Sequence, residues 1–548
     1  MFMRIKTSYI LVVLIILIAI GVRIFVFFNT DHYDGDSIHR IIGSYRYASH
    51  PFNIAQYYIE STGASGQLSY FFLNTLLMHF VDEPILISRI ISFIFGILMI
   101  IPYYWLIKLA FSQDIALASI FVLAFYSVHI LYSVISLAVA ECLFFIILAV
   151  YFSMQHLYKT DSKKSKIYFI ASIISTILAT SFRVDAWPLV VFLSFVFLKE
   201  KRLKEALIFF VFSSFYIITI SCIYYKVSGN LLLSSFKTMC LPTPVDPAPL
   251  VFINSSFKGL SRLLITRPDM PSYGKYQISI WFGTLFYTLS FLLSLLGFLG
   301  MFDAFKNKKQ YVFFLNFWCF FILLTLRQII SNHYPDERYS YIIVIFFIPF
   351  IFLGVTNIVL YICRRLGLAY FYKRVLVISL MMIASTYFIF VSRDHFIKDL
   401  LPRMKYNFFI RNLTNWVGKN INSGDIIIFP AYTSELYTAE LENKFVGINY
   451  YIDNLTVIFN HNKEYKLDKE IINEIQDFIR KQRVVETITG TCVSRLLIKR
   501  GHTYKARRIV FILDERFYKF LKEEHPNLLK KIEIKYDGFL YSGVLPLL

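Results

Sequence analysis

Ionisable residues interrupt the apolar sequence at four places, and these residues could do chemistry. The first group is Asp34 and Asp36 in DHYDGDSIHR, and the second is Glu141 in LAVAECLFF. The other two groups place an arginine beside acids, around Arg183 in SFRVDAWP and around Arg338 in HYPDERYSY. A carboxylate can take a proton from an attacking hydroxyl or amine, and a guanidinium can hold a departing phosphate. These residue types therefore fit transfer of a group from a phosphate-linked donor.

A sugar is the transferred group that best suits nearby carboxylates. Its anomeric carbon becomes positively charged in the transition state, as in glycoside hydrolysis, and a carboxylate stabilises that charge. Each group alone is explained equally well as a polar loop in contact with water. Only elements that bring all four groups to one side of the molecule would make them a site.

The composition indicates that these elements lie in a membrane. Hydrophobic residues make up 57% of the 548 positions and charged residues only 17%, with a mean hydropathy of +0.57. Soluble domains average roughly 45–50% apolar and about 25% charged residues. Apolar runs at 8–28 and 87–107 exceed the roughly 20 residues that cross a hydrocarbon core. The first run has no cleavage site after it, so we expect it to be retained as a span.

Apolar runs between charged breaks predict about eleven transmembrane helices, the fifth and sixth of which are short enough to be half-depth helices. The predicted spans are 8–28, 85–107, 115–131, 137–157, 167–182, 186–198, 206–225, 278–300, 311–330, 340–361 and 374–391.

Basic residues gather in alternate loops, which predicts a cytoplasmic N-terminus and places these loops in the cytoplasm. They are Lys108; Lys159, Lys163, Lys164 and Lys166; Lys199, Lys201, Arg202 and Lys204; Lys306, Lys308 and Lys309; and Arg364, Arg365, Lys373 and Arg374. All four ionisable groups then lie at the outer face, as do the larger outer loops 29–84 and 226–277 and the tail. Within the first loop, the stretch 68–80 is too short to span and predicts helices along the outer interface.

The tail differs in character from the rest of the chain. Short strands are predicted near 424–430, 507–513 and 530–536, and an amphipathic helix at 467–482. The sequence therefore predicts two domains, a transmembrane catalytic domain at 1–391 and a small extracytoplasmic α/β domain at 392–548.

Other classes of function are disfavoured. The net charge of +20 is concentrated beside apolar spans, where topology explains it better than nucleic-acid binding does. The six cysteines have no metal-ligand spacing, and His32, His39 and His333 lack HxH or HxxxH spacing. No cofactor is indicated with certainty, and a divalent metal is left open.

At the ionisable groups the chain resembles the GT-C glycosyltransferases, especially family 39-like enzymes such as protein O-mannosyltransferases and aminoarabinose transferases. The matching segments are YDGDSIHRIIGSYRYAS, the stretch from Gln67 with Arg89, Ser92 and Gly96, and SVISLAVAECLFF, TSFRVDAWPLV and ERYSYIIVIFFIPF. The arrangement is similar over roughly residues 1–360. Ser37 departs from the family pattern, because a second acid is usual at this position.

The resemblance implies roles for individual residues. Asp36 would be the general base or charge-stabilising carboxylate, and Asp34 would assist it or bind a metal. The phosphate of the donor would be held by Arg183, Arg338 and Tyr339. The substrate would be oriented by Glu141, Asp185 and Glu337. Simpler roles stay open: Arg183 could pair with Asp185, Arg338 with Asp336 or Glu337, and Glu141 could stabilise a helix N-terminus.

We therefore expect a multi-pass enzyme, in a prokaryotic plasma membrane, that transfers a sugar from a polyprenyl-phosphate donor to a lipid, protein or glycan acceptor. Transfer would take place at the outer face with inversion, and the partners would include membrane lipids but no nucleic acid. A transporter is one alternative, although it predicts charges at the membrane midplane and paired halves. A scaffold subunit of a cell-envelope assembly, or an inactive family member because of Ser37, is another.

Overall fold

The computed structural model describes 14 stretches of the chain, and all structural statements below concern these residues. They are residues 2–30, 44, 68–81, 84–159, 162–228, 290–331, 337–367, 369–395, 425–428, 508–513, 518–519, 522–523, 525–536 and 541–546. The chain divides into two compact units, and each is described by itself. The first comprises 1–30, 63–77 and 86–402, and the second comprises 31–62, 78–85 and 403–548.

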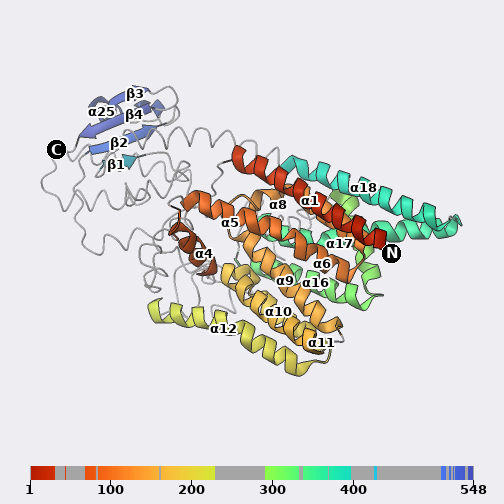
Figure 1. Ribbon diagram of the computed structural model, residues 1–548. Coiled ribbons are helices and arrows are strands. Elements are labelled where there is room, and N and C mark those ends of the chain that lie inside the picture. Colours follow the sequence, from red (N-terminus) through yellow and green to blue (C-terminus); the bar gives the residue numbers. More distant parts are fainter. Residues whose placement is uncertain are drawn as a thin grey trace, which may run out of the picture. The chain divides into compact units, whose positions relative to one another are not determined.

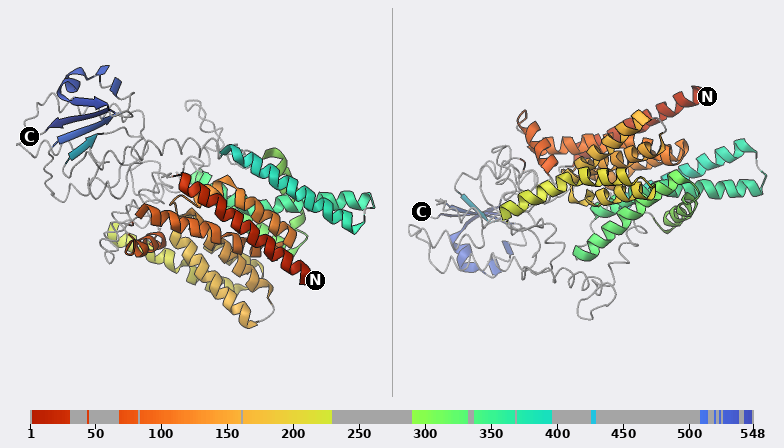
Figure 2. Two further views of the ribbon diagram at one scale, coloured as in Figure 1. Left: turned by 45° about the horizontal axis from the view of Figure 1, so that its top comes forward. Right: turned by 90° about the horizontal axis from the view of Figure 1, so that it is seen from below.

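The first unit consists of helices that run back and forth beside one another (Figures 1 and 2). They are α1 (Phe2–Asn29), α4 (Leu68–Met78), α5 (Pro84–Leu98), α6 (Ile100–Ala110), α7 (Gln113–Phe125), α8 (Ser127–Tyr132), α9 (Val139–Tyr158), α10 (Ser162–Phe182), the 3-10 turn η1 (Val184–Ala186), α11 (Pro188–Lys199), α12 (Leu203–Ser228), the helix Ser290–Ala304, α16 (Lys308–Ser331), α17 (Glu337–Arg365) and α18 (Tyr370–His395).

The polytopic helical architecture predicted from hydropathy is confirmed. Among the described residues, seven helices or helix pairs are long and apolar enough to cross a membrane. They lie at Tyr9–Asn29, Leu86–Ala110, Val139–Tyr158, Lys163–Phe182, Leu203–Ile223, Tyr341–Arg365 and Tyr372–Ser392. Each predicted span overlaps a described helix, while the total of about eleven stays a prediction. The stretch 68–80 is helical, as predicted, in α4.

The fifth predicted span is longer than the hydropathy pattern indicated. Helix α10 begins at Ser162 and has 21 residues, so it is no half-depth helix. Its first turns contain Lys163, Lys164 and Lys166, and these charged residues lower the hydropathy at the start of the helix. They can still belong to a membrane helix, because the long apolar stem of a lysine extends along apolar surface. The sixth, α11, remains short at 12 residues.

Helix α17 forms the centre of the unit. The most apolar stretch of α17 is 83% buried, whereas those of α1 and α12 are only 22% buried. The latter two helices therefore leave most of their apolar residues exposed. The helix Ser290–Ala304 packs closely against α17 through glycines. A Cβ on Gly300 would lie 1.9 Å from the carbonyl oxygen of Phe350, and one on Gly354 would lie 2.0 Å from that of Leu296. Small residues permit such close packing of membrane helices.

The second unit contains a four-stranded sheet with the order β1-β2-β4-β3 (Figure 1). Strands β1 (Asp425–Ile428) and β2 (Arg508–Leu513) are parallel, whereas β4 (Tyr541–Pro546) is antiparallel to β2 and to β3 (Glu533–Tyr536). The short helix α25 (Pro526–Lys531) precedes β3. The three predicted strands correspond to β1, β2 and β3. Strand β4 was not predicted, because YSGVLP contains glycine and proline and alternates poorly.

The parallel pairing of β1 with β2 requires a crossover connection. The chain between them includes the predicted helix at 467–482, which lies outside the described residues.

Candidate active site

The site is organised by a buried connection between α8 and α9. Residues 133–138, SVISLA, leave α8 after Tyr132 and enter α9 at Val139, and all six are buried. The last of them, Ala138, has a φ of 58°, in the left-handed region that non-glycine residues avoid. This conformation costs roughly 1–2 kcal/mol. The cost indicates that the surrounding contacts hold the connection in place. We call these six residues the arginine-bound turn, because three arginines contact it.

Arg89 of α5 joins this turn to the end of α1. Its guanidinium donates hydrogen bonds to the carbonyl oxygens of Val134 (3.1 Å), Phe27 (2.7 Å) and Thr30. The same group lies 4.1 Å from the centre of the Phe27 ring. A cation at the C-terminal end of a helix is favoured by the helix dipole. Arg89 thereby fixes the C-terminal end of α1 against the turn.

Arg23 contacts the turn from deeper in the bundle. Its Nε donates to the hydroxyl of Ser133 (3.2 Å), and its Nη1 donates to the carbonyl oxygens of Ala19 (3.1 Å) and Ala124 (3.1 Å). The side chain is fully buried. A buried guanidinium is costly at membrane level and is tolerated where backbone carbonyls surround it. Arg23 therefore fixes α1 against the end of α7 and the start of the turn.

Two residues predicted for the site, Arg183 and Glu141, also lie at the arginine-bound turn. Arg183 donates a 2.9 Å hydrogen bond from Nη1 to the carbonyl oxygen of Leu137. Glu141, fully buried, lies in the first turn of α9 and accepts a 2.8 Å hydrogen bond from Ser92. The structure thus brings these two predicted residues together, although 42 positions separate them in the sequence. Glu141 also has the place expected of an acid that interacts favourably with a helix dipole.

The start of α17 lies beside α8. The hydroxyl of Tyr341 contacts Nδ1 of His129, and the two rings stack with centroids 5.8 Å apart. Tyr132 packs against the same tyrosine at 5.5 Å. Arg338 precedes Tyr341 by less than one helical turn, so its backbone lies at the end of the bundle that holds the arginine-bound turn.

The remaining predicted residues divide into two sets. Asp34 and Asp36 lie outside the described residues. Arg338, Tyr339 and Glu337 in α17, and Asp185 in η1, have described backbones, but their side chains are outside what the structure describes. Their predicted roles therefore stay predictions. Within the described part of the chain, no group of three or more His, Cys, Asp or Glu residues could hold a metal ion.

Sequence reasoning did not assign Arg23, Ser133, His129 or Tyr341 to this region. A signal for Arg23 was present, because an arginine inside the apolar run 8–28 is unusual and marks a residue that faces the interior of a bundle. The other three are ordinary in composition. Only the packing of α1, α8 and α17 brings them together.

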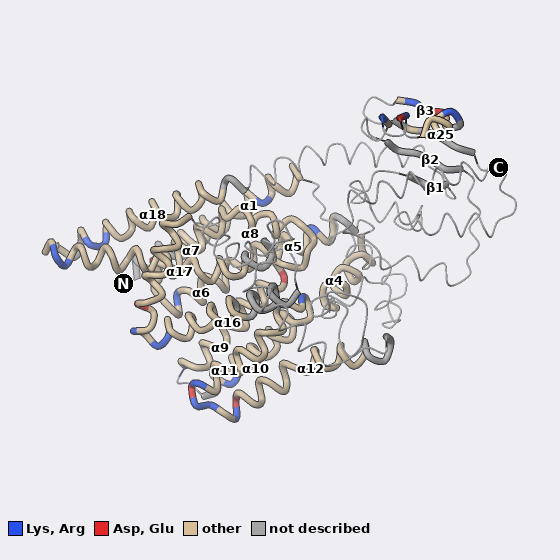
Figure 3. Tube along the Cα trace, turned by 180° about the vertical axis from the view of Figure 1, so that it is seen from behind, with Lys and Arg blue, Asp and Glu red and all other residues tan. Residues whose placement is uncertain are grey.

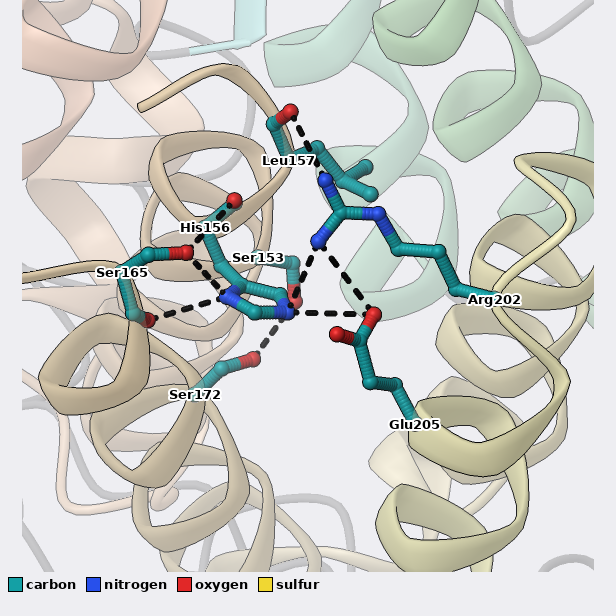
Figure 4. A network of polar contacts seen from close by, with 7 residues as sticks. All are labelled: Ser153, His156, Leu157, Ser165, Ser172, Arg202 and Glu205. Atoms are coloured by element: carbon teal, nitrogen blue, oxygen red, sulfur yellow. Dashed lines mark hydrogen bonds and ion pairs between the residues drawn. The ribbon is translucent and has the colours of Figure 1, made fainter. Parts of the chain in front are cut away.

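A second polar network lies at the opposite end of α9 (Figure 4). Nδ1 of His156 lies 2.8 Å from the hydroxyl and 2.9 Å from the carbonyl oxygen of Ser165, and Nε2 lies 3.3 Å from both Arg202 and Glu205. Arg202 also pairs with Glu205 at 3.3 Å. Since 15 residues of helix separate His156 from Glu141, the network lies about 22 Å from the arginine-bound turn. It ties the ends of α9, α10 and α12 together.

The helical fold is similar to that of solved oligosaccharyltransferases. Archaeal oligosaccharyltransferase AglB from Archaeoglobus fulgidus, in complex with an inhibitory peptide and a dolichol-phosphate, matches with a TM-score of 0.51 and 12% identity. The match covers 99% of this chain and 74% of that chain. The apo form of the oligosaccharyltransferase from the same organism matches with a TM-score of 0.50 and 11% identity, over 92% and 69% of the two chains.

ArnT from Cupriavidus metallidurans, bound to undecaprenyl phosphate, matches with a TM-score of 0.46 and 10% identity, over 97% of both chains. No protein-family model matches the sequence, and no curated protein matches it at a significant level. At these identities, the similarity to the oligosaccharyltransferase defines the fold alone.

Proposed function

We propose that this protein is a membrane glycosyltransferase that moves a sugar from a polyprenyl-phosphate donor to an acceptor at the extracytoplasmic face. The observation that carries the proposal is the convergence of Arg23, Arg89 and Arg183 on the arginine-bound turn, with Glu141 at its exit. Arg89 also holds Thr30, and Asp34 and Asp36 follow within six residues. In this proposal, the segment that carries these two carboxylates begins directly after a residue that Arg89 holds.

The fold supports a lipid-linked donor. The oligosaccharyltransferase with this fold was solved with a dolichol-phosphate, a polyprenyl phosphate. A donor with such a tail lies in the bilayer, so an enzyme that uses it is expected among apolar helices. In this proposal, Arg183 and Arg338, with Tyr339, hold the phosphate, because guanidinium groups bind phosphate oxygens with strong charge-assisted hydrogen bonds.

The proposed chemistry is a single displacement. Asp36 accepts the proton of the attacking hydroxyl or amine, or stabilises positive charge at the anomeric carbon, and Asp34 assists it. Glu141, Asp185 and Glu337 orient the substrates. The proposed domains are a catalytic membrane part at 1–391 and an outer α/β part at 392–548 that limits access of the acceptor. The N-terminus is proposed to be cytoplasmic, in a prokaryotic plasma membrane.

Reconstitution in liposomes with a panel of radiolabelled polyprenyl-phosphate sugars tests the proposal. The wild-type protein should transfer label from at least one donor, and Asp36→Asn should reduce turnover by about a hundredfold or more, as expected for loss of a general base. Asp114→Asn, in the first turn of α7 beyond the proposed site, is the matched control and should keep full activity.

Absence of transfer from every donor, with the protein correctly folded, would favour the scaffold interpretation instead. Equal activity of Asp36→Asn and wild type would remove Asp36 from the mechanism.

A further inference from the structure

The end of the helical unit opposite the arginine-bound turn carries most of its positive charge. Figure 3 places Lys and Arg at the turns where described helices meet at this end. They flank the α11–α12 and α17–α18 turns and begin α10 and α16. The preference of Lys and Arg for cytoplasmic loops is enough to explain positive charge at one end of a membrane protein. One part of this end, however, has features that topology does not require.

That part joins the ends of α9 and α11 to the start of α16, and we call it the lysine–tyrosine cluster: Lys199, Lys308, Lys309, Tyr158 and Tyr311. The ammonium of Lys199 contacts the hydroxyl of Tyr311 and lies 4.4 Å from the centre of its ring. Lys309 lies 5.6 Å from the centre of the Tyr158 ring. The hydroxyl of Tyr158 donates to the carbonyl oxygen of Lys308 at 3.1 Å. The lysines of two helices, α11 and α16, thus lie together beside the end of α9.

The cluster has a positive charge that its described acid does not balance. Glu200 pairs with Lys308 at 2.5 Å, and 66% of the lysine side chain remains exposed. The three lysines and this single carboxylate leave a charge of +2. Helix α16 has no acid in its first turn, so the positive end of its dipole adds to the charges of Lys308 and Lys309. The cluster is therefore electrostatically suited to an anion.

Exposed apolar side chains near the cluster indicate which kind of anion it would bind. Leu198, which precedes Lys199 in α11, is 49% exposed, and Phe305, whose ring lies 5.7 Å from that of Tyr311, is 54% exposed. A soluble anion would make no favourable contact with these apolar side chains. A phospholipid can place its phosphate between the lysines and an acyl chain along Leu198 and Phe305. Basic pockets between membrane helices on the cytoplasmic side bind anionic lipid headgroups in this way.

We propose that the lysine–tyrosine cluster is a binding site for one anionic phospholipid, with the phosphate held by Lys199, Lys308 and Lys309 and the acyl chain on Leu198 and Phe305. The site is separate from the proposed transfer reaction, and its occupancy is measured without any sugar donor.

Native mass spectrometry of the purified full-length protein tests this, with added phosphatidylglycerol as the probe and phosphatidylcholine as the neutral comparison. The wild type should retain phosphatidylglycerol in preference to phosphatidylcholine. The triple variant Lys199→Gln/Lys308→Gln/Lys309→Gln should bind phosphatidylglycerol about tenfold more weakly or worse, since each cation near a membrane surface contributes to anionic-lipid binding. The matched control, Arg364→Gln/Arg365→Gln/Lys373→Gln, removes the same charge at the α17–α18 turn and should retain the lipid.

Two further variants keep the result interpretable. Replacement of the three lysines by arginine preserves charge and should preserve binding, which excludes a folding defect as the cause. Leu198→Ser/Phe305→Ser leaves the charge unchanged and should weaken phosphatidylglycerol binding severalfold. Equal losses in the cluster triple and the control triple, or displacement of the lipid by millimolar inorganic phosphate with no effect of the serine substitutions, would overturn the proposal.

Discussion

The hydroxyl of Ser92 on α5 donates a 2.8 Å hydrogen bond to the carboxylate of Glu141 on α9, and both side chains are fully buried. A carboxylate inside an apolar bundle is stable only where hydrogen-bond donors surround it. Ser92 is one such donor, and it fixes the carboxylate beside the arginine-bound turn. The first turn of α9 and the middle of α5 are thereby held in register.

Replacement of Ser92 should destabilise the protein through Glu141. Ser92→Ala removes a hydrogen bond to a buried acid, so we expect the free energy of unfolding to fall by about 1–3 kcal/mol. The measurement is the midpoint of thermal unfolding in detergent. Ser194→Ala is the control, because among the described residues the Ser194 hydroxyl bonds only to the carbonyl oxygen of Val190 in its own helix. This variant should change stability by less than about 0.5 kcal/mol. Equal shifts in both variants would contradict this account.

Arg89 should be sensitive to replacement even by lysine. Its planar guanidinium reaches the carbonyls of Phe27, Thr30 and Val134 at once, whereas a single ammonium on a flexible stem cannot reproduce that geometry. We expect Arg89→Lys to lower the unfolding midpoint and to reduce transfer activity about tenfold or more, because the exit toward Asp36 is no longer fixed.

Lys108→Gln is a suitable comparison for Arg89→Lys. This lysine lies at the other end of α5 and α6, where it contacts the rings of Tyr9 and Tyr104. It should leave activity unchanged. Full activity of Arg89→Lys with an unchanged unfolding midpoint would show that the planar guanidinium is not needed at this position.

The sequence predicted the helices well because membrane insertion is a local property of the chain. Twenty apolar residues bury themselves in lipid whatever their neighbours, so hydropathy located α1, α9 and α17 directly. Helix α10 was placed with less accuracy, since the lysines at its start resemble a loop. The strand β4 was missed for a similar reason, because its glycine and proline conceal the pattern.

The site was less predictable, because its parts meet only through packing. Nothing in SVISLA indicates that residues 133–138 bind three arginines from three helices. Glu141 and Arg183 were identified by type and by side of the membrane, and the structure places both at the turn. Arg23 was overlooked inside an apolar run, although a buried charge there requires a partner.

The glycines between α17 and the helix Ser290–Ala304 provide a test of helix packing. Gly354→Ala places a methyl group 2.0 Å from the carbonyl oxygen of Leu296, which neither backbone can accommodate. We expect a loss of stability of about 1–3 kcal/mol or more. Gly21→Ala in α1 meets nothing within 4 Å, so it should be neutral or stabilise the helix by about 0.5–1 kcal/mol. Thermal unfolding of the two variants side by side checks the prediction, and similar midpoints would contradict it.

In the network around His156, the more buried side chains should contribute more to the free energy of unfolding. Ser165 is buried and bonds the imidazole directly, so Ser165→Ala should cost about 1 kcal/mol. Arg202 and Glu205 are each about a third exposed, and a solvated ion pair contributes roughly 0–1 kcal/mol. Arg202→Gln should therefore destabilise the protein less than Ser165→Ala does, and salt should weaken its effect further. The reverse order of unfolding midpoints would indicate that the ion pair dominates.

Arg183 distinguishes a structural role from a role in donor binding. Its hydrogen bond to the carbonyl of Leu137 predicts that Arg183→Gln lowers the unfolding midpoint. If Arg183 also holds the donor phosphate, as we propose, the KM for the lipid-linked donor should rise about tenfold or more, because a charged hydrogen bond contributes about 1.5–3 kcal/mol. Arg183→Lys keeps the charge and should recover part of the donor affinity, though not all of it, since lysine lacks the planar, multiply donating guanidinium. Steady-state kinetics with varied donor, beside thermal unfolding of both variants, separate the two roles. A lowered midpoint with an unchanged KM in Arg183→Gln would restrict Arg183 to holding the arginine-bound turn, and the phosphate would then depend on Arg338.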